Sequence, residues 1–209
     1  MLRILIADEQ PVVRRGIRDI LKEEYPSSEI VEIEDLDTLL QRALRETWDL
    51  AISDISIHGC TGFDALDRIH VAAPSLPVLI VSGLPEEQFA VRVLRAGAAG
   101  YLSKDLAPEE LIRAVRTVLG GRKYITARAA ETLLTTVQHG SGRPPHELLS
   151  DREFEVFRLL AAGAAITDIA AQLALSATTV STYRARLLTK MKCSSNADLV
   201  RYALQNGIK

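Results

Sequence analysis

The chain has 209 residues, of which 47% are hydrophobic and 25% charged, a composition typical of a globular protein with room for one large domain or two modest ones. It contains no run of about 18 apolar residues that could span a bilayer and begins without a signal-peptide pattern, so we expect a cytoplasmic protein with no membrane contact. Its two cysteines, Cys60 and Cys193, are too few for a disulfide framework and too widely spaced for a metal-binding motif.

The net charge of −2 combines an acidic and a basic part of the chain. Residues 1–140 contain 16 Lys and Arg against 21 Asp and Glu, a net charge of −5, whereas residues 141–209 contain 9 against 6, a net charge of +3. Between these parts, two glycines and a Pro-Pro pair in residues 140–146 oppose regular structure. We therefore expect a first domain at residues 1–121, a linker at 122–147 with a helix at 127–137, and a second domain at 148–209.

The acidic part alternates apolar, strand-like runs with segments of helical periodicity. The expected strands cover residues 2–7, 29–33, 49–53, 77–81 and 98–102. The helices between them are expected to begin near Pro11, Asp35, Gly62 and Glu86, with a fifth after Pro108. Five such units with right-handed crossovers predict an α/β fold, a five-stranded doubly wound parallel sheet with helices on both faces.

Polar and charged side chains follow four of the five expected strands. Asp8 and Glu9 come after the first strand, Asp54 after the third, and Ser82 and Lys104 at the ends of the fourth and fifth. Because parallel strands end at the same edge of a sheet, these groups should meet in one crevice beyond the strands' carboxyl ends. Three carboxylates so close would resist full ionisation unless a cation joined them, so the pattern indicates a divalent metal site.

With these residues in place, residues 1–121 resemble a CheY-like receiver domain, and the whole chain resembles a response regulator of the NarL/FixJ family. The resemblance implies that Asp54 accepts a phosphoryl group from a sensor histidine kinase. It also implies that Asp8, Glu9 and Asp54, with the backbone carbonyl of Ser56, hold Mg²⁺. A hard cation on oxygen ligands suits phosphoryl transfer, which places charge on the transferred oxygens.

The resemblance also implies a switch. Ser82 and Lys104 are expected to bind the phosphoryl oxygens, Ser82 by swinging toward them, and Tyr101 is expected to follow Ser82 inward. A local electrostatic change would then alter the surface of the domain. The affected face is expected at about residues 86–119 or at the first helix, and receivers of this family dimerise through such surfaces.

Three places depart from the family's pattern. Glu9 stands where Asp is usual, Ile57-His58 stands where Met-Pro is common, and Asp105 stands where Pro often follows the lysine. Glu9 adds a methylene to a metal ligand, and Asp105 removes the residue type that favours a cis peptide bond. None of these changes removes a group with a catalytic role, so we expect them to alter rates and affinities.

The basic part carries the signals of a smaller, all-α helix-turn-helix domain. Ser150 with Glu153 forms a capping-box pattern, a short helix is expected at residues 167–173, and Ser176 caps a longer helix at 177–191. In the longer helix the residues expected to face inward are Val180, Leu187, Leu188 and Met191. Residues 148–209 resemble a LuxR-type DNA-binding domain through Leu149–Glu153, Asp168–Ala170 with Leu173, and Leu175–Ser176 with Thr179–Val180.

In such domains the longer helix enters the major groove of double-stranded DNA. No acidic residue occurs in residues 177–193, which carry four basic residues and a local charge of +4. The positions expected to face base edges are Ser181, Thr182 and Ala185. The positions expected nearby, for phosphate or base contacts, are Thr178, Thr179, Tyr183, Arg184, Arg186 and Lys190.

A final helix, at about residues 195–205, has two open interpretations: it either pairs with its copy in a homodimer on DNA or completes the core of its own domain. The function indicated is a transcription factor that is phosphorylated on itself and has no external substrate. Two alternatives remain. An aspartyl-phosphate phosphohydrolase would need an acid where Ser56 stands, and a phosphorylation-independent interaction module would follow if Glu9 or the Ile57-His58 loop impaired metal binding.

Overall fold

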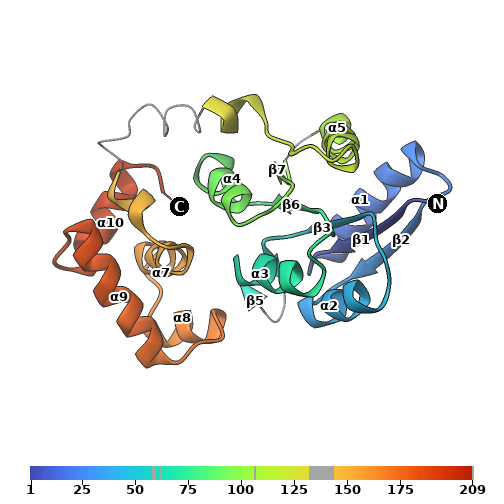
Figure 1. Ribbon diagram of the computed structural model, residues 1–209. Helices are drawn as coiled ribbons and strands as arrows, with labels where there is room; N and C mark the ends of the chain where they lie inside the picture. Colours follow the sequence, from blue (N-terminus) through green and yellow to red (C-terminus); the bar gives the residue numbers. More distant parts are fainter. Residues whose placement is uncertain (58–59, 62, 106, 132–143, 209) are drawn as a thin grey trace. The chain divides into compact units, whose positions relative to one another are not determined.

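The computed structural model describes residues 1–57, 60–61, 63–105, 107–131 and 144–208 (Figure 1). The chain forms two compact units, Met1–Leu133 and Leu134–Lys209. Residues 127–131 are helical, as expected; the rest of the helix expected at 127–137, the linker residues 140–143 and His58 lie outside the described residues. None of the helices in the described ranges is long and apolar enough to cross a membrane.

The first unit is built on a parallel sheet with the strand order β2-β1-β3-β6-β7. Its strands are β1 (Arg3–Ala7), β2 (Glu29–Ile33), β3 (Leu50–Ser53), β6 (Val78–Ser82) and β7 (Gly100–Ser103). Every neighbouring pair is parallel, and the register pairs Ala7 with Ser53 and Ser82 with Ser103. The doubly wound parallel sheet predicted from the sequence is therefore confirmed, and all five strands end at the same edge.

The helices of this unit start where the sequence supplies a suitable first residue. They are α1 (Pro11–Glu24), α2 (Leu36–Arg45), α3 (Phe63–Ala72), α4 (Glu86–Arg95) and α5 (Pro108–Leu119). Proline at the first position of α1 and α5 costs no hydrogen bond, and the Asp35 carboxylate caps α2 by accepting from Thr38 N at 2.8 Å. In Figure 1, α1 and α5 lie on one side of the sheet, and α2 and α3 on the other.

A two-stranded antiparallel ribbon, β4 (Ser56–Ile57) and β5 (Cys60–Thr61), follows β3. The sequence analysis did not predict it, because two-residue strands are too short to show a hydrophobic period.

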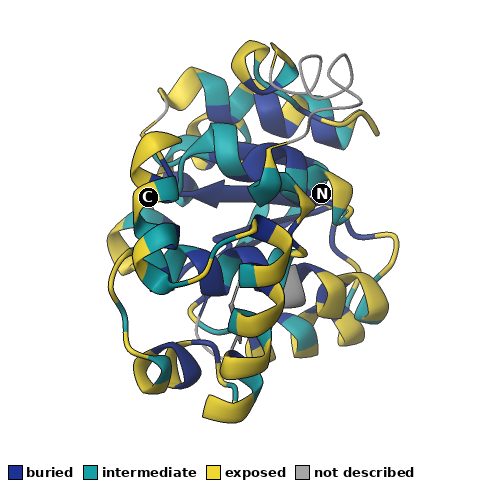
Figure 2. Cartoon of the chain, turned by 90° about the vertical axis from the view of Figure 1, so that its left-hand side faces the viewer, coloured by how far each residue is buried: buried dark blue, intermediate teal, exposed yellow. Residues whose placement is uncertain are grey.

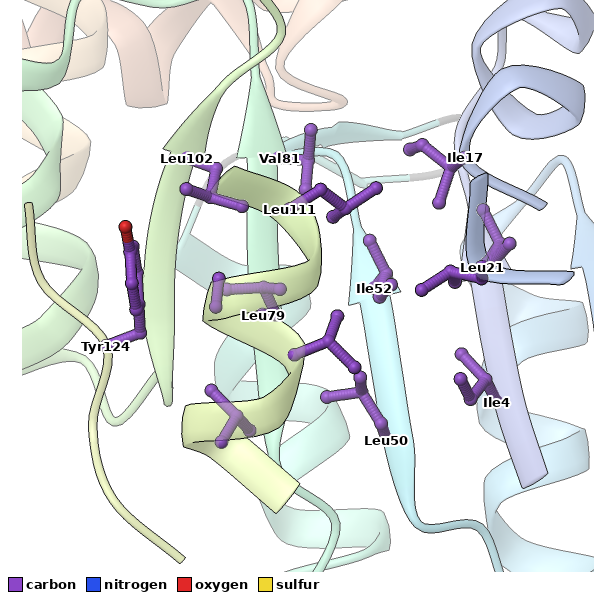
Figure 3. Close-up of a cluster of buried hydrophobic side chains, with 14 residues drawn as sticks. Ile4, Ile17, Leu21, Leu50, Ile52, Leu79, Val81, Leu102, Leu111 and Tyr124 are labelled. Atoms are coloured by element: carbon purple, nitrogen blue, oxygen red, sulfur yellow. The ribbon is translucent and has the colours of Figure 1, made fainter. Parts of the chain in front are cut away.

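The core of the sheet is filled from both faces, as a parallel sheet requires. The inner strands β3 and β6 are buried throughout, the edge strand β2 is mostly half-buried, and the outer surfaces of the helices are exposed (Figure 2). On one face the side chains of α1 and α5 pack against those of alternate strand residues (Figure 3). Ile4, Ile6, Leu50, Ile52 and Leu79 are no more than 1% exposed in this cluster, and each fully buried aliphatic side chain contributes about 1.5–3 kcal/mol.

The second unit is all-α and confirms the helix-turn-helix prediction. It comprises the 3₁₀ helix η1 (Pro145–Leu148) and the α-helices α7 (Asp151–Ala161), α8 (Ile166–Gln172), α9 (Ala177–Met191) and α10 (Asn196–Gln205). The expected capping box is formed: Ser150 N donates to Glu153 Oε2 at 2.8 Å, and Glu153 N donates to Ser150 Oγ at 3.4 Å. At α9 and α10 the side chains of Ser176 and Ser195 accept from Thr179 N and Asp198 N, without the reciprocal bond of a capping box. These caps fix where the helices begin.

The turn between α8 and α9 uses a left-handed residue. Ala174 has a φ of 51°, and Leu175 N donates to Ala170 O at 2.8 Å, which closes the C-terminus of α8. In α9, Val180, Leu187 and Met191 are buried, whereas Leu188, also expected to face inward, is only half-buried. The buried residues define the side of α9 that packs on α7 and α8 and leave the opposite side exposed.

Gly100 should be one of the least replaceable residues of the sheet. A Cβ atom there would lie 2.9 Å from Leu79 Cδ1 and 3.0 Å from Tyr124 Cβ. Gly100→Ala should lower the free energy of unfolding by about 1–3 kcal/mol, because neither the core nor the neighbouring backbone has room for the methyl group. The measurement is urea unfolding of the full chain, followed by the fluorescence of Trp48, the only tryptophan.

The matched control is Gly16→Ala. Gly16 lies inside α1 with no atom within 4 Å of the position of a Cβ, and alanine there should raise the free energy of unfolding by about 0.5–1 kcal/mol. If Gly100→Ala were as stable as the wild type, Leu79 and Tyr124 would have to move aside at little cost to accommodate the methyl group.

Candidate functional site

Three charged side chains meet at the carboxyl edge of the sheet. Lys104 Nζ donates a hydrogen bond to Asp54 Oδ2 at 2.7 Å and lies 2.6 Å from Asp8 Oδ2. The backbone positions them: Asp54 N donates to Ala7 O at 2.8 Å, and Lys104 N donates to Ser82 O at 2.9 Å. The sheet register thus brings together Asp8 and Asp54, 46 positions apart along the chain, and Lys104, a further 50 positions on.

The two carboxylates of this site share one neighbouring ammonium group, that of Lys104. Asp8 is 1% and Asp54 8% exposed, so both are largely removed from water. Burial by itself would lower the pKa of Lys104, but the carboxylates of Asp54 and Asp8 outweigh that effect and raise it. Lys104 is therefore charged at neutral pH, and with both acids ionised the three groups carry a net negative charge. Such a site favours a second cation.

Asp8 has a carboxylate oxygen suited to that cation. Asp8 Oδ2 is buried and accepts no hydrogen bond of normal geometry from the described residues, although the Lys104 ammonium is close enough for an ion pair. Its other oxygen, Oδ1, accepts from Gln10 N at 2.8 Å, which orients the group. A buried oxygen with an unused lone pair beside a second carboxylate fits a hard divalent ion.

The expected cluster of three carboxylates is not formed. Glu9 is exposed, and among the described side chains no group of three His, Cys, Asp or Glu residues could hold a metal ion. Glu9 lies just past the end of β1, directly after Asp8, and its side chain is exposed. Asp8 and Asp54 are the acids that the structure joins, through Lys104, and Ser56 lies in β4, paired with Thr61.

The two residues expected to act as a switch meet at Leu84. Leu84 N lies 3.4 Å from Ser82 Oγ, and Tyr101 OH donates to Leu84 O at 2.6 Å. Both side chains are 1% exposed, so the ring of Tyr101 lies inside the domain. The two side chains thus contact the N–H and the C=O of the same residue.

Arg14 is a residue of this region that the sequence analysis missed. Its guanidinium donates to the backbone carbonyl of Asp8 and lies 3.7 Å from Glu32 Oε2, although Arg14 is only 9% exposed. It therefore holds the turn that carries Asp8. A signal was present in the sequence: Arg14 lies three and seven positions before Ile17 and Leu21, on the apolar stripe of α1.

The second group of predicted residues lies on α9. Thr178, Ser181, Thr182, Ala185, Arg186 and Lys190 are exposed, whereas Thr179, Tyr183 and Arg184 are half-buried. The hydroxyls of Ser181 and Thr182 donate to Ala177 O at 2.9 Å and Thr178 O at 3.0 Å, bonds that one side-chain rotation can exchange for an external acceptor. The exposed side of α9 is thus polar and basic along its length.

Two of the basic residues on α9 already have partners within the domain. Lys190 Nζ lies 2.6 Å from Oε2 of Glu153, whose side chain is 4% exposed and belongs to the capping box of α7. Arg184 Nε donates to Asn196 Oδ1 at 2.7 Å, at the start of α10. Lys190 therefore fastens α9 to α7, a role that the sequence analysis did not foresee.

Comparison with known proteins agrees with both halves of this structure. Residues 4–116 match the response regulator receiver domain, and residues 147–203 match the luxR family of bacterial regulatory proteins. The chain belongs to the NarL/FixJ family of response regulators. This response regulator therefore has a receiver domain and a LuxR-type DNA-binding domain.

Its similarity to individual relatives extends over the whole chain. The regulator is 36% identical to the transcriptional activator protein ExaE of Pseudomonas putida, over 98% of this chain and 97% of ExaE. It is 30% identical to the response regulator GacA of Pseudomonas viridiflava, over 100% of this chain and 98% of GacA. It also resembles RcsB of Salmonella enterica serovar Typhimurium bound to the rprA promoter with phosphomimetic BeF₃⁻, with a TM-score of 0.72, 26% identity, and coverage of 96% of this chain and 97% of RcsB.

The ion pair between Lys190 and Glu153 gives the response regulator a pH-dependent stability. Burial by itself would raise the pKa of Glu153, but the hydrogen bonds from Lys190 and Ser150 outweigh it and lower the pKa below its usual 4.5. This stabilisation is complete above the ordinary pKa and is lost as the pH falls through the lower folded-state value. Lys190→Gln should cost about 1 kcal/mol at pH 7, and the difference from the wild type should shrink as the pH falls below 4.5 and vanish once Glu153 is protonated in the folded chain.

Differential scanning calorimetry of the full chain measures this effect. The relevant transition is the one not accompanied by a change in Trp48 fluorescence, because Trp48 belongs to the first unit. Lys192→Gln is the control, since Lys192 is exposed and just past the end of the same helix. An equal loss of stability in Lys190→Gln and Lys192→Gln, or a loss that persists at acidic pH, would contradict a stabilising ion pair between Lys190 and Glu153.

Proposed function

We propose that Asp54 is the phosphoacceptor of this response regulator and that a sensor histidine kinase supplies the phosphoryl group. The observation that carries the proposal is the Lys104 ammonium 2.7 Å from the buried Asp54 carboxylate at the carboxyl edge of the sheet. A carboxylate oxygen of Asp54 forms the new bond to phosphorus as the bond to the donor nitrogen breaks. Lys104 then faces the oxygens on which negative charge accumulates.

Receiver domains use Mg²⁺ for this reaction, and we propose that Asp8 and Asp54 hold it here, with Ser56 and Glu9 as further ligands expected from the family. The fit rests on the buried Asp8 oxygen, which has no hydrogen bond of normal geometry from the described residues. When bound, the ion would neutralise charge on the phosphoryl oxygens. Arg14, through the Asp8 carbonyl, holds the turn in place, and the buried strands exclude water from the acyl phosphate.

On the output side, we propose that the exposed face of α9 reads double-stranded DNA as part of a transcription factor. Ser181, Thr182 and Ala185 are placed for base edges, and Arg186 is the exposed guanidinium beside them. The structure of RcsB bound to a promoter supports this arrangement by similarity. Phosphorylation would act by favouring a homodimer or a DNA-bound form, in the cytoplasm where the DNA is accessible, with no external substrate turned over.

Glu9 favours one alternative, a receiver that regulates through contacts without being phosphorylated. Its side chain is exposed, and among the described residues no group of three His, Cys, Asp or Glu side chains is arranged to hold a metal ion. The experiment that follows separates the two functions.

Asp54→Asn should abolish phosphorylation while leaving the fold intact, because it keeps the size of the side chain and removes the nucleophile. Incubation with a small-molecule phosphodonor and Mg²⁺, with intact-mass detection, should show one phosphoryl group on the wild type and on the control Asp67→Asn, whose side chain is exposed on α3. Phosphorylation should raise the DNA affinity of these two proteins by about fivefold or more, as expected of a coupled site. An unlabelled wild type would support the phosphorylation-independent function.

Arg186→Gln should weaken DNA binding about equally for all sequences and reduce the slope of log affinity against log salt by about one, since one phosphate contact is lost. Fluorescence anisotropy with labelled duplexes at several salt concentrations provides the measurement. The matched control is Arg201→Gln on α10, where the guanidinium is ion-paired with Asp198. An unchanged slope for Arg186→Gln would remove α9 from the interface.

A further inference from the structure

The segment that follows α5 lies along the edge of the sheet. Tyr124 forms a parallel bridge with Gly100, and its N–H donates to Ala99 O at 2.8 Å. Its side chain is 6% exposed and belongs to the core cluster, and Figure 3 shows it beside the strand that carries Leu102. The chain thus reaches the linker only after it has been anchored against β7.

The same segment is attached to both ends of α4. At the C-terminal end, Lys123 Nζ donates to Leu94 O at 3.1 Å. At the N-terminal end, Thr126 Oγ1 donates to the Glu86 carboxylate, and the Arg128 guanidinium pairs with Glu87. We call these four residues, Lys123, Tyr124, Thr126 and Arg128, the clasp. Thr126 Oγ1 also accepts from Ala129 N at 3.2 Å, so it caps the helix that leads into the linker.

The N-terminal end of α4 is also where the switch residues act. Ser82 contacts the N–H and Tyr101 the C=O of Leu84, and Leu84 is followed by Pro85, which precedes the first residue of α4, Glu86. A short and continuous set of contacts therefore joins the phosphoacceptor edge to the linker helix. The groups in these contacts are the backbone N–H and C=O of Leu84 and the carboxylates of Glu86 and Glu87.

We propose that the clasp transmits the phosphorylation state of Asp54 to the linker, an inference that rests on the proposed function. When the Ser82 hydroxyl turns toward a phosphoryl group, its contact with Leu84 N is broken and the loop that carries Glu86 and Glu87 can move. Thr126 and Arg128 then change partners, and with Thr126 the cap of the linker helix changes. The clasp gives the receiver a direct mechanical connection to the linker.

The test removes both side-chain contacts at the N-terminal end of α4, in the double variant Thr126→Val with Arg128→Gln. Both are changed because the Arg128 pair is largely exposed and contributes little alone. Phosphorylation of the double variant should stay at one group per chain, whereas the gain in DNA affinity on phosphorylation should fall to within about twofold of no effect. Arg122→Gln, an exposed arginine just before the clasp, is the control and should keep the full gain.

Hydrogen exchange gives a readout that does not depend on DNA. Beryllofluoride with Mg²⁺ should change the exchange rate of amides in residues 122–131 of the wild type by about fivefold or more, and should not change it in Asp54→Asn. The pair Glu87→Arg with Arg128→Glu restores opposite charges and should recover part of the coupling that Arg128→Glu alone loses.

The outcomes separate this inference from the function on which it rests. A wild type that is not phosphorylated would refute the proposed function. A phosphorylated double variant that keeps the wild-type gain in DNA affinity, or a wild type whose 122–131 amides do not respond to beryllofluoride, would overturn the clasp while leaving Asp54 as the phosphoacceptor.

Discussion

The ammonium of Lys104, held between the carboxylates of Asp8 and Asp54, is the interaction on which the receiver depends. Two carboxylates that are nearly out of water would repel one another, and a single ammonium group at 2.6 and 2.7 Å from their oxygens offsets that repulsion. The arrangement exists because three parallel strands end together, so the stability of the sheet and the chemistry of its edge cannot be separated. The carboxylate oxygens of the site suit a metal ion, and the ammonium group of Lys104 suits the oxygens of a phosphoryl group.

The DNA-binding domain uses its charges differently. Not every basic side chain on α9 is available to DNA, because the buried Glu153 holds Lys190 and Asn196 holds Arg184. Glu153 serves two purposes, since it caps α7 through Ser150 and fastens α9 through Lys190. One carboxylate thus sets the position of the recognition helix relative to the helix behind it. Arg186, exposed on the same helix, is left to provide charge for a phosphate.

Residues 123–128, the start of the linker predicted at 122–147, belong to the first unit and complete the edge of its sheet. Tyr124 contributes to the core, so this part of the chain cannot detach without exposing apolar surface. Thr126 and Arg128 contact the first residues of α4, next to the loop that Ser82 and Tyr101 contact. A strong anchor beside weak, movable contacts is the arrangement expected of a switch that repositions a linker without unfolding the domain.

The sequence by itself determined the features that depend on near neighbours. The apolar runs gave the strands, Pro11, Asp35 and Ser150 marked helix starts through local backbone chemistry, and the parallel order put Asp8, Asp54 and Lys104 at one edge. Tertiary structure alone decided the contacts between distant groups: Lys104 between two acids, Arg14 on the Asp8 carbonyl, and Lys190 on Glu153, 37 positions away. The physical reason is that periodicity and caps act within one or two turns, whereas an ion pair between remote residues depends on helix orientation and side-chain direction, which only the packed fold fixes.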